Sequence, residues 1–146
     1  MSLLKSLDIS ASALEAERER MNVISSNLAN ANTTRTEEGG PYRRKDVVFS
    51  ARGTGIEFDK LMRLALDGEL KEVKVDAIVE DKRPPRMVYN PAHPDANQQG
   101  YVAMPNISVM EEMVNMITSE RAFESNTQAI QTTKSMASQA IMVGSK

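Results

Sequence analysis

Apolar residues repeat every seven positions at both ends of the chain, and this feature constrains the fold more than any other. Near the N-terminus the repeat is carried by Leu7, Leu14, Met21 and Leu28. Near the C-terminus a three-four spacing runs through Val109, Met113, Met116, Phe123, Ile130, Ala137 and Ile141. Helices with such a repeat bury one stripe against another helix. The sequence therefore predicts two long terminal helices that lie along one another and along neighbouring copies.

The first predicted helix covers residues 3–31 and ends in residues that favour turns. Its apolar stripe contains Leu4, Leu7, Ala11, Leu14, Met21 and Leu28. Several asparagines and the breaker sequence Gly39-Gly40-Pro41 follow, so the helix should end near Asn32. Because side-chain amides can bond to the free carbonyls of a helix end, Asn27, Asn30 and Asn32 could close the helix or bind an adjacent subunit.

Between the two helices, apolar and polar residues alternate with the period of a β-strand. The alternation is plainest at Val73, Val75, Ala77 and Val79. It predicts a half-buried strand, and the β-branched and aromatic run at residues 47–49 predicts a second one. For the segment between these strands, Asp67-Gly68 favours a hairpin turn, although residues 58–66 also fit a short helix.

Five prolines between Lys82 and Asn106 predict an extended or turned arm that leads to the last helix. Proline fixes the backbone angle φ and donates no backbone hydrogen bond, so only a short strand is expected here, at residues 87–89. Two basic groups, at residues 43–45 and 82–86, contain no aromatic residues among them. We expect them to form solvated or ion-paired loops.

The last predicted helix has more apolar surface than one partner helix can cover. Ser108 and Glu111 have the spacing of a capping box, so this helix should begin near Val109. Continued to Val143, it would be about 52 Å long. A second apolar face opens at Met110, Val114 and Ile117. Polar residues that would favour one register fall in the predicted seam at Glu120, Thr127 and Lys134. Other subunits are therefore expected to cover part of this helix.

The composition disfavours catalysis and several classes of ligand. The chain has no cysteine, which excludes disulfides, thiol catalysis and thiolate metal sites. A formal charge of -2 and 4% aromatic residues disfavour nucleic acid as a partner. His93 is the only histidine, and its proline-rich loop lacks the further ligands of a metal site. We therefore expect no catalytic residue, cofactor, metal or small-molecule substrate.

The sequence also gives no sign of a membrane segment or a cleaved leader. No run of about eighteen apolar residues occurs. Residues 1–7 lack the basic start, apolar stretch and small-residue cleavage site of a secretory signal. No membrane insertion and no cleaved signal are expected.

The end of the first helix carries a motif that resembles a known family. Residues 25–33, Ser-Ser-Asn-Leu-Ala-Asn-Ala-Asn-Thr, are similar to the signature that ends the N-terminal helix of bacterial flagellar rod and hook proteins. Further segments resemble the proteins of the proximal rod, namely residues 40–43, 47–49, 89–91, 93–96, 100–102, 104–106, 112–114, 121–123, 126 and 134–136. The resemblance covers nearly the whole chain. It departs from the family at Arg52 to Glu72, which is longer and richer in charge.

This resemblance implies a structural subunit of the flagellar basal body. Such a subunit is exported by the flagellar type III apparatus without a cleaved signal, and it assembles with copies of itself and other rod proteins. The product is a helical drive shaft that crosses the periplasm and transmits torque from the motor to the hook. No reaction would be catalysed.

The predicted fold is α+β, with long N- and C-terminal helices packed as an antiparallel coiled-coil-like domain and a small β-rich middle domain. Residues 1–34 and 107–146 would form the two helices of an axial core domain, and residues 35–106 the β-rich middle domain with its proline-rich arm. The predicted assembly interface contains Leu7, Leu14, Met21, Asn27, Leu28, Asn30, Met113, Met116, Phe123, Ile130 and Ile141.

Two other functions remain as alternatives to the rod subunit. One is a cytoplasmic coiled-coil adaptor that binds a protein partner through its β domain. The other is an enzyme, which would require a formed pocket with convergent polar groups.

Overall fold

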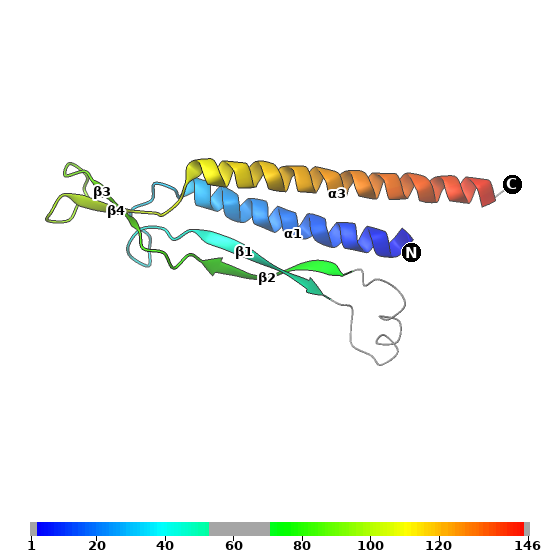
Figure 1. Ribbon diagram of the computed structural model, residues 1–146, viewed down its shortest axis with the longest axis horizontal. Helices are drawn as coiled ribbons and strands as arrows, with labels where there is room; N and C mark the ends of the chain where they lie inside the picture. The colour runs from blue at the N-terminus through cyan, green and yellow to red at the C-terminus, as the bar shows by residue number, and fades with distance from the viewer. Residues whose placement is uncertain (1–2, 53–70, 145–146) are drawn as a thin grey trace, which may run out of the picture.

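The computed structural model describes residues 3–52 and 71–144 of the chain (Figure 1). Its elements, in chain order, are α1 (Leu3–Ala29), β1 (Lys45–Arg52), β2 (Glu72–Glu80), β3 (Arg86–Tyr89), β4 (Tyr101–Met104) and α3 (Val109–Gly144). Two terminal helices with antiparallel strands between them confirm an α+β fold. In the described ranges, neither helix has a stretch apolar enough and long enough to span a bilayer.

The two helices lie side by side and run in opposite directions (Figure 1). With 27 and 36 residues, they are about 40 and 54 Å long, so the end of α3 extends past the start of α1. The β1–β2 hairpin packs on α1, whereas α3 contacts only α1 among the described elements. The elongated body thus has three layers, with α1 in the middle and one side of α3 uncovered.

The first helix ends at Ala29, three residues before the predicted end near Asn32, and Asn30 closes it. The backbone N–H of Asn30 donates to the Ser26 carbonyl at 3.1 Å, and its side-chain amide donates to the same oxygen at 2.9 Å. A turn at residues 30–32 follows. These bonds satisfy a carbonyl that would otherwise be free at the helix end.

The buried surface of α1 is broader than the predicted stripe. Its most buried residues, with the following turn, are Ala16, Val23, Ile24, Asn27 and Ala31. The heptad residues Leu7, Leu14, Met21 and Leu28 are only half-buried. Ala11, which was placed in the stripe, is exposed, so that part of the prediction is wrong. The reason is that α1 packs on both α3 and the β1–β2 hairpin. A single stripe describes the contact with one partner helix, and it does not describe burial against two partners.

The last helix begins at Val109, as predicted. The Ser108 hydroxyl accepts a hydrogen bond from the Glu111 N–H at 3.4 Å, and the Ser108 carbonyl accepts one from Glu112 at 3.0 Å. The buried and half-buried positions of α3 with three-four spacing are Glu112, Met116, Ser119, Phe123, Asn126, Ile130, Thr133 and Ala137. These positions form two rows along the helix. The row with Met116, Phe123 and Ile130 was predicted from the sequence.

The second row of the seam lies one position earlier than predicted. Of the polar residues predicted for the seam, Thr127 is half-buried, whereas Glu120 and Lys134 are exposed and their places are taken by Ser119 and Thr133. Met113 precedes Met116 by three residues and Glu112 precedes it by four, and both spacings place a residue beside Met116 on a helix. The row of Met113 was predicted because methionine is apolar, whereas the structure buries the row of Glu112.

The strands form two separate two-stranded sheets. In the first, β1 pairs antiparallel with β2 from Lys45 opposite Glu80 to Arg52 opposite Glu72, with a bulge between Val48 and Phe49. In the second, β3 pairs antiparallel with β4. The strands predicted at residues 47–49, 73–79 and 87–89 are confirmed, and β4 was not predicted. The choice between a hairpin and a helix at residues 58–68 falls outside the described residues.

Candidate assembly interface

The end of α1 carries a buried polar network that joins three segments of the chain. Asn27 is 0% exposed and uses its whole amide. Its Nδ2 donates to the Lys45 carbonyl at 2.8 Å and to Glu112 Oε2 at 3.0 Å. Its Oδ1 accepts from the Lys45 N–H at 2.9 Å and from the Tyr42 hydroxyl at 3.2 Å. These four bonds fill the two donor and two acceptor positions of an asparagine side chain.

The pair of bonds to Lys45 resembles the pairing of a neighbouring strand. Asn27 accepts from the N–H and donates to the carbonyl of the same β1 residue, as a peptide group of a third strand would. Near the other end of the hairpin, the Ser12 hydroxyl accepts from the N–H of Val73 in β2 at 3.2 Å. Two polar side chains of α1 thus hold the backbone of the hairpin at points about 22 Å apart along the helix.

An ion pair completes the network. The Glu112 carboxylate, 1% exposed, accepts from Arg44 Nε at 2.7 Å, and Arg44 also donates to Asp46 at 3.0 Å. Burial would lower the pKa of the Arg44 guanidinium, but hydrogen bonds and charge attraction from Glu112 and Asp46 outweigh it and raise that pKa. We call Asn27, Tyr42, Arg44, Lys45 and Glu112 the Asn27 network.

Sequence reasoning missed most of this network. The prediction of a solvated or ion-paired loop for Arg44 is confirmed, but its partner Glu112 was not identified as a buried residue. One signal was available, because Glu112 has three-four spacing with Met116, Ser119 and Phe123 and therefore belongs to the same face of α3. The pairing of Asn27 with Lys45 joins residues on two different elements and leaves no such pattern.

The residues predicted for the assembly interface occupy three kinds of place. Asn27 is buried within the chain. A larger group is half-buried between the elements, namely Leu7, Leu14, Met21, Leu28, Asn30, Met116, Phe123 and Ile130. Met113 and Ile141 are 53% and 72% exposed. Direct contact with another subunit is therefore open to Met113 and Ile141 without any rearrangement.

The exposed surface of α3 carries two apolar patches, and the first of them lies on the side that faces away from α1. The first, which we call the proximal patch, contains Val109, Met110, Met113, Val114 and Ile117. Its most exposed member, Met110, is 81% exposed. The second lies near the C-terminal end, at Met136, Ile141 and Val143. Contiguous exposed apolar residues of this kind mark sites of protein contact.

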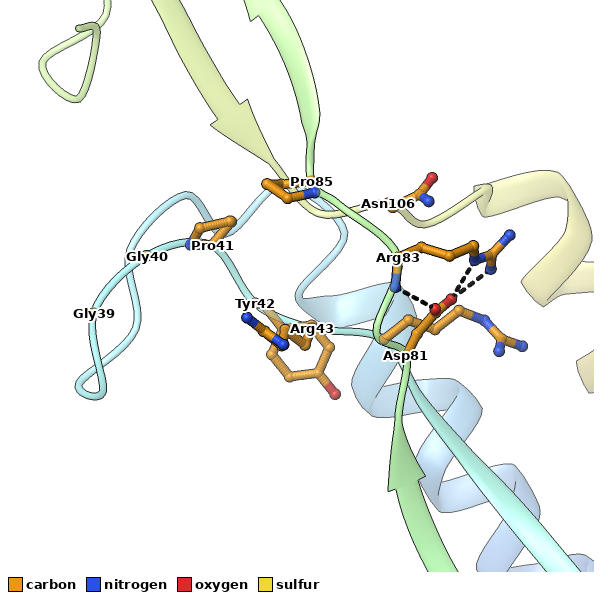
Figure 2. A pocket seen from close by; sticks show the side chains of 10 residues that line it. Gly39, Gly40, Pro41, Tyr42, Arg43, Asp81, Arg83, Pro85 and Asn106 are labelled. Carbon is orange, nitrogen blue, oxygen red and sulfur yellow. Dashed lines mark hydrogen bonds and ion pairs between the residues drawn. The ribbon is translucent and has the colours of Figure 1, made fainter.

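The loop beside the Asn27 network borders a small hollow of about 150 Å³ (Figure 2). It is lined by Gly39, Gly40, Pro41, Tyr42, Arg43, Arg44, Asp81, Arg83, Pro85 and Asn106. Figure 2 shows Arg83 turned onto Asp81, to which its Nε donates at 2.6 Å. Arg44 is held by Glu112 and Asp46. Arg83 and Asp81 thus bond to each other, and Arg44 bonds to residues outside the hollow, so these three side chains do not converge on a ligand.

His93 stabilises a loop. Its Nδ1 accepts from the Asp95 N–H at 3.1 Å, and Asp95 in turn accepts from the Thr34 hydroxyl at 2.7 Å. The loop between β3 and β4 is thereby attached to the turn after α1. Within residues 3–52 and 71–144, no three histidine or carboxylate side chains gather as a metal site would require.

Comparison with known proteins identifies the class of protein. Residues 7–35 match the family model described as "Flagella basal body rod protein". Residues 98–142 match the model described as "Flagellar basal body rod FlgEFG protein C-terminal". The first match covers most of α1, and the second covers β4 and nearly all of α3. The paired helices are therefore those of a flagellar basal-body rod protein.

Curated relatives narrow the class. The flagellar basal-body rod protein FlgC of Bacillus subtilis is 42% identical, with 99% of each chain covered. FlgC of Salmonella typhimurium is 40% identical, with 99% of each chain covered, and FlgC of Borreliella burgdorferi is 39% identical, with 98% of each covered. The chain belongs to the FlgC family of flagellar basal-body rod proteins. Its relatives are structural proteins, so it is a rod component and not an enzyme, and the adaptor alternative is not favoured.

Proposed function

We propose that this chain assembles with copies of itself and other rod proteins into a helical drive shaft that transmits torque from the motor to the hook. The observation that carries this proposal is the proximal patch of α3, which leaves five large apolar side chains exposed. No other described element contacts α3 on that side. Burial of such side chains stabilises an interface by about 25 cal/mol for each Å².

Long helices that overlap between subunits suit a shaft under torsion. Each contact between two apolar atoms is weak, but a helix of 36 residues can share shear over many of them. We further propose that α1 and α3 pack as a coiled-coil-like pair, with Met116, Phe123 and Ile130 as one row of the seam. The three-four spacing of the buried positions of α3 supports this packing.

Membership of the family supports the remaining parts of the proposal. Residues 1–34 and 107–146 would form an axial core domain, and residues 35–106 the middle domain. The chain would pass through the flagellar type III export apparatus without a cleaved signal and join a rod that crosses the periplasm. The predicted interface residues would take part in assembly either directly, as Met113 and Ile141, or by shaping the helical pair.

The test replaces two residues of the proximal patch in a strain that lacks the native gene. Val114→Asp with Ile117→Asp should leave the chain folded but abolish motility and the rod, because neither side chain supports the α1–α3 seam and two buried charges cannot be accommodated at an apolar interface. Gln128→Asp, on an exposed polar part of the same helix, is the control. Electron microscopy of isolated basal bodies gives the result. Normal rods with the double variant would contradict the proposal.

A further inference from the structure

We propose that Asn27, Arg44 and Glu112 are positioning residues for assembly. They hold the β1–β2 hairpin and the helical pair in one relative orientation, and rod formation requires that orientation more than it requires their contribution to stability. This inference rests on the proposed function, because it concerns how a rod subunit presents its surfaces to its neighbours.

Apart from the hydrogen bond between Ser12 and Val73 near the far end, the other contacts between the hairpin and α1 are weakly directional. Phe49 lies under Arg20, with the guanidinium carbon 6.0 Å from the ring centre, and Val73 and Val75 are half-buried. Apolar contacts such as those of Val73 and Val75 are proportional to area and tolerate sliding. Hydrogen bonds tolerate little change in distance or angle. The two bonds from Asn27 to Lys45 therefore fix the hairpin at its base in a way that packing does not.

The Asn27 network also reaches α3. Asn27 and Arg44 both bond to Glu112, in the first turn of α3, so the same network ties the start of that helix to α1 and to the strand entry. A polar residue at one position of an apolar helical seam fixes register at some cost in stability. Glu112 begins a polar row that continues through Ser119 and Asn126 beside the apolar row of Met116, and it bonds to Asn27 of α1.

Burial of this ion pair is a poor source of stability. Removing two charges from water costs about as much as their attraction returns, and apolar replacements of similar size are often as stable. The network therefore contributes a fixed orientation between the hairpin and the helical pair, which an apolar cluster would not provide. It matters here because apolar residues are exposed both on α3, at the proximal patch, and on the hairpin, at Val48 and Val79. A neighbour that contacts both surfaces needs a constant angle between them, and in an open helical assembly each error is repeated at every subunit.

The experiment separates orientation from stability. In Arg44→Met with Glu112→Gln, no buried charge is left unpaired, and the introduced side-chain amide retains an oxygen for Asn27. Because the chain has no cysteine, spin labels can be attached only at introduced ones, for which the exposed Asp76 of β2 and Gln128 of α3 are suitable. We expect the double variant to keep the unfolding midpoint of the wild type, to broaden the distance distribution between the labels, and to form no rods in cells.

The matched control is Val102→Ala, which shortens a buried side chain of β4 outside the network. It should lower the unfolding midpoint, keep the narrow distance distribution and still form rods. If the double variant fails to fold, Arg44→Lys decides the question with the same measurements, because lysine keeps the charge but lacks the planar fork that reaches Glu112 and Asp46 together.

Two results would overturn the inference. One is a distance distribution as narrow as that of the wild type, and the other is normal rod formation despite a broadened distribution. A different result would show that the proposed rod function is wrong: the wild-type protein itself would then be absent from isolated basal bodies.

Discussion

At the scale of single residues, two asparagines three positions apart perform different tasks. Asn30 closes α1 by bonding to the Ser26 carbonyl one turn earlier. Asn27 is directed into the molecule and joins α1 to Lys45 and to Glu112. The sequence indicates that both amides stand at a helix end, where free carbonyls need partners. Which of them faces inward depends on where α3 and β1 lie, and this information is absent from the local sequence.

The two asparagines therefore differ in their expected effect on stability. Asn27→Ala leaves the Lys45 backbone groups and one Glu112 oxygen without their partner, so we expect the free energy of unfolding to fall by about 3 kcal/mol. Asn30→Ala, at the helix end, should cost about 1 kcal/mol or less. Urea denaturation of both variants measures the difference. Equal effects would contradict the central place of Asn27.

A pH dependence is expected from the neighbouring strand connection. Side-chain and backbone hydrogen bonds from Arg83 hold the pKa of Asp81 below its ordinary value. The resulting stabilisation is complete above the unfolded aspartate pKa of about 3.9 and disappears as the pH falls through the lower folded value.

Asp81→Asn should therefore be less stable than the wild type at neutral pH, and the difference should vanish in acid. Thermal unfolding across the acid range gives this comparison, with Asp8→Asn on the exposed side of α1 as the control. A difference that stays constant down to the lowest pH would show that the charge of Asp81 is not responsible.

At the scale of elements, local patterns predicted the helices and three strands, and they failed where two partners compete for one element. The end of α1 and the start of α3 carry their own capping residues, so both were predictable. The row of α3 that faces α1 was partly mispredicted, since Met113 and Glu112 are adjacent and only packing chooses between them. The short strand β4 was missed because β3 stabilises it across the sheet.

Protection of α3 should follow its contact with α1. In the isolated chain at low concentration, we expect rapid hydrogen exchange at both chain ends, including α3 beyond Ala137, and slower exchange from Glu112 to Phe123. Rapid exchange at the end of α3 is expected because this helix extends past the start of α1 (Figure 1). Mass spectrometry of exchanged peptides tests this expectation. Strong protection of both ends in a dilute monomer would argue against it.

The β3–β4 hairpin should respond separately from the helices. Gly100 has φ +80°, and a Cβ added there would lie 2.8 Å from the ring of Tyr89, which packs edge-on against Tyr101. Gly100→Ala should therefore disturb the tyrosine pair. Gly40→Ala, at the same φ with open space around it, should show only the backbone cost of about 1 kcal/mol.

The near-ultraviolet circular dichroism of the tyrosines reports on their pairing, and the far-ultraviolet signal reports on the helices. We expect Gly100→Ala to change the first and leave the second, because β3 and β4 contact only one another among the described elements. Loss of helical signal in this variant would mean that the hairpin supports α1 and α3 after all.

At the scale of the whole molecule, the uncovered surfaces lie on different parts of an elongated body. The proximal patch is near the start of α3, and the second apolar patch is at its far end. A surface that does not match itself joins subunits head to tail, and such contacts continue into rings or helices instead of closing as a dimer. The asymmetry of the fold therefore agrees with membership of a rod family.

Association of the purified chain should accordingly be open-ended. Sedimentation velocity over a dilution series should show a steady increase in size with concentration. The proximal-patch variant of Val114 and Ile117 should remain monomeric under the same conditions, because the apolar contact is lost. A dimer of constant size at all concentrations would be inconsistent with growth into a shaft.

The sequence alone determined the two terminal helices, the strands at residues 47–49, 73–79 and 87–89, and the family, because heptad repeats, alternation, capping residues and the asparagine-rich motif are local patterns. Tertiary structure decided which row of α3 is buried, that Asn27 bonds to Lys45, and that Arg44 reaches Glu112. These outcomes depend on the path of the chain between segments far apart in sequence. Hydrogen bonds between them form only when the packing of both helices and the hairpin is already in place.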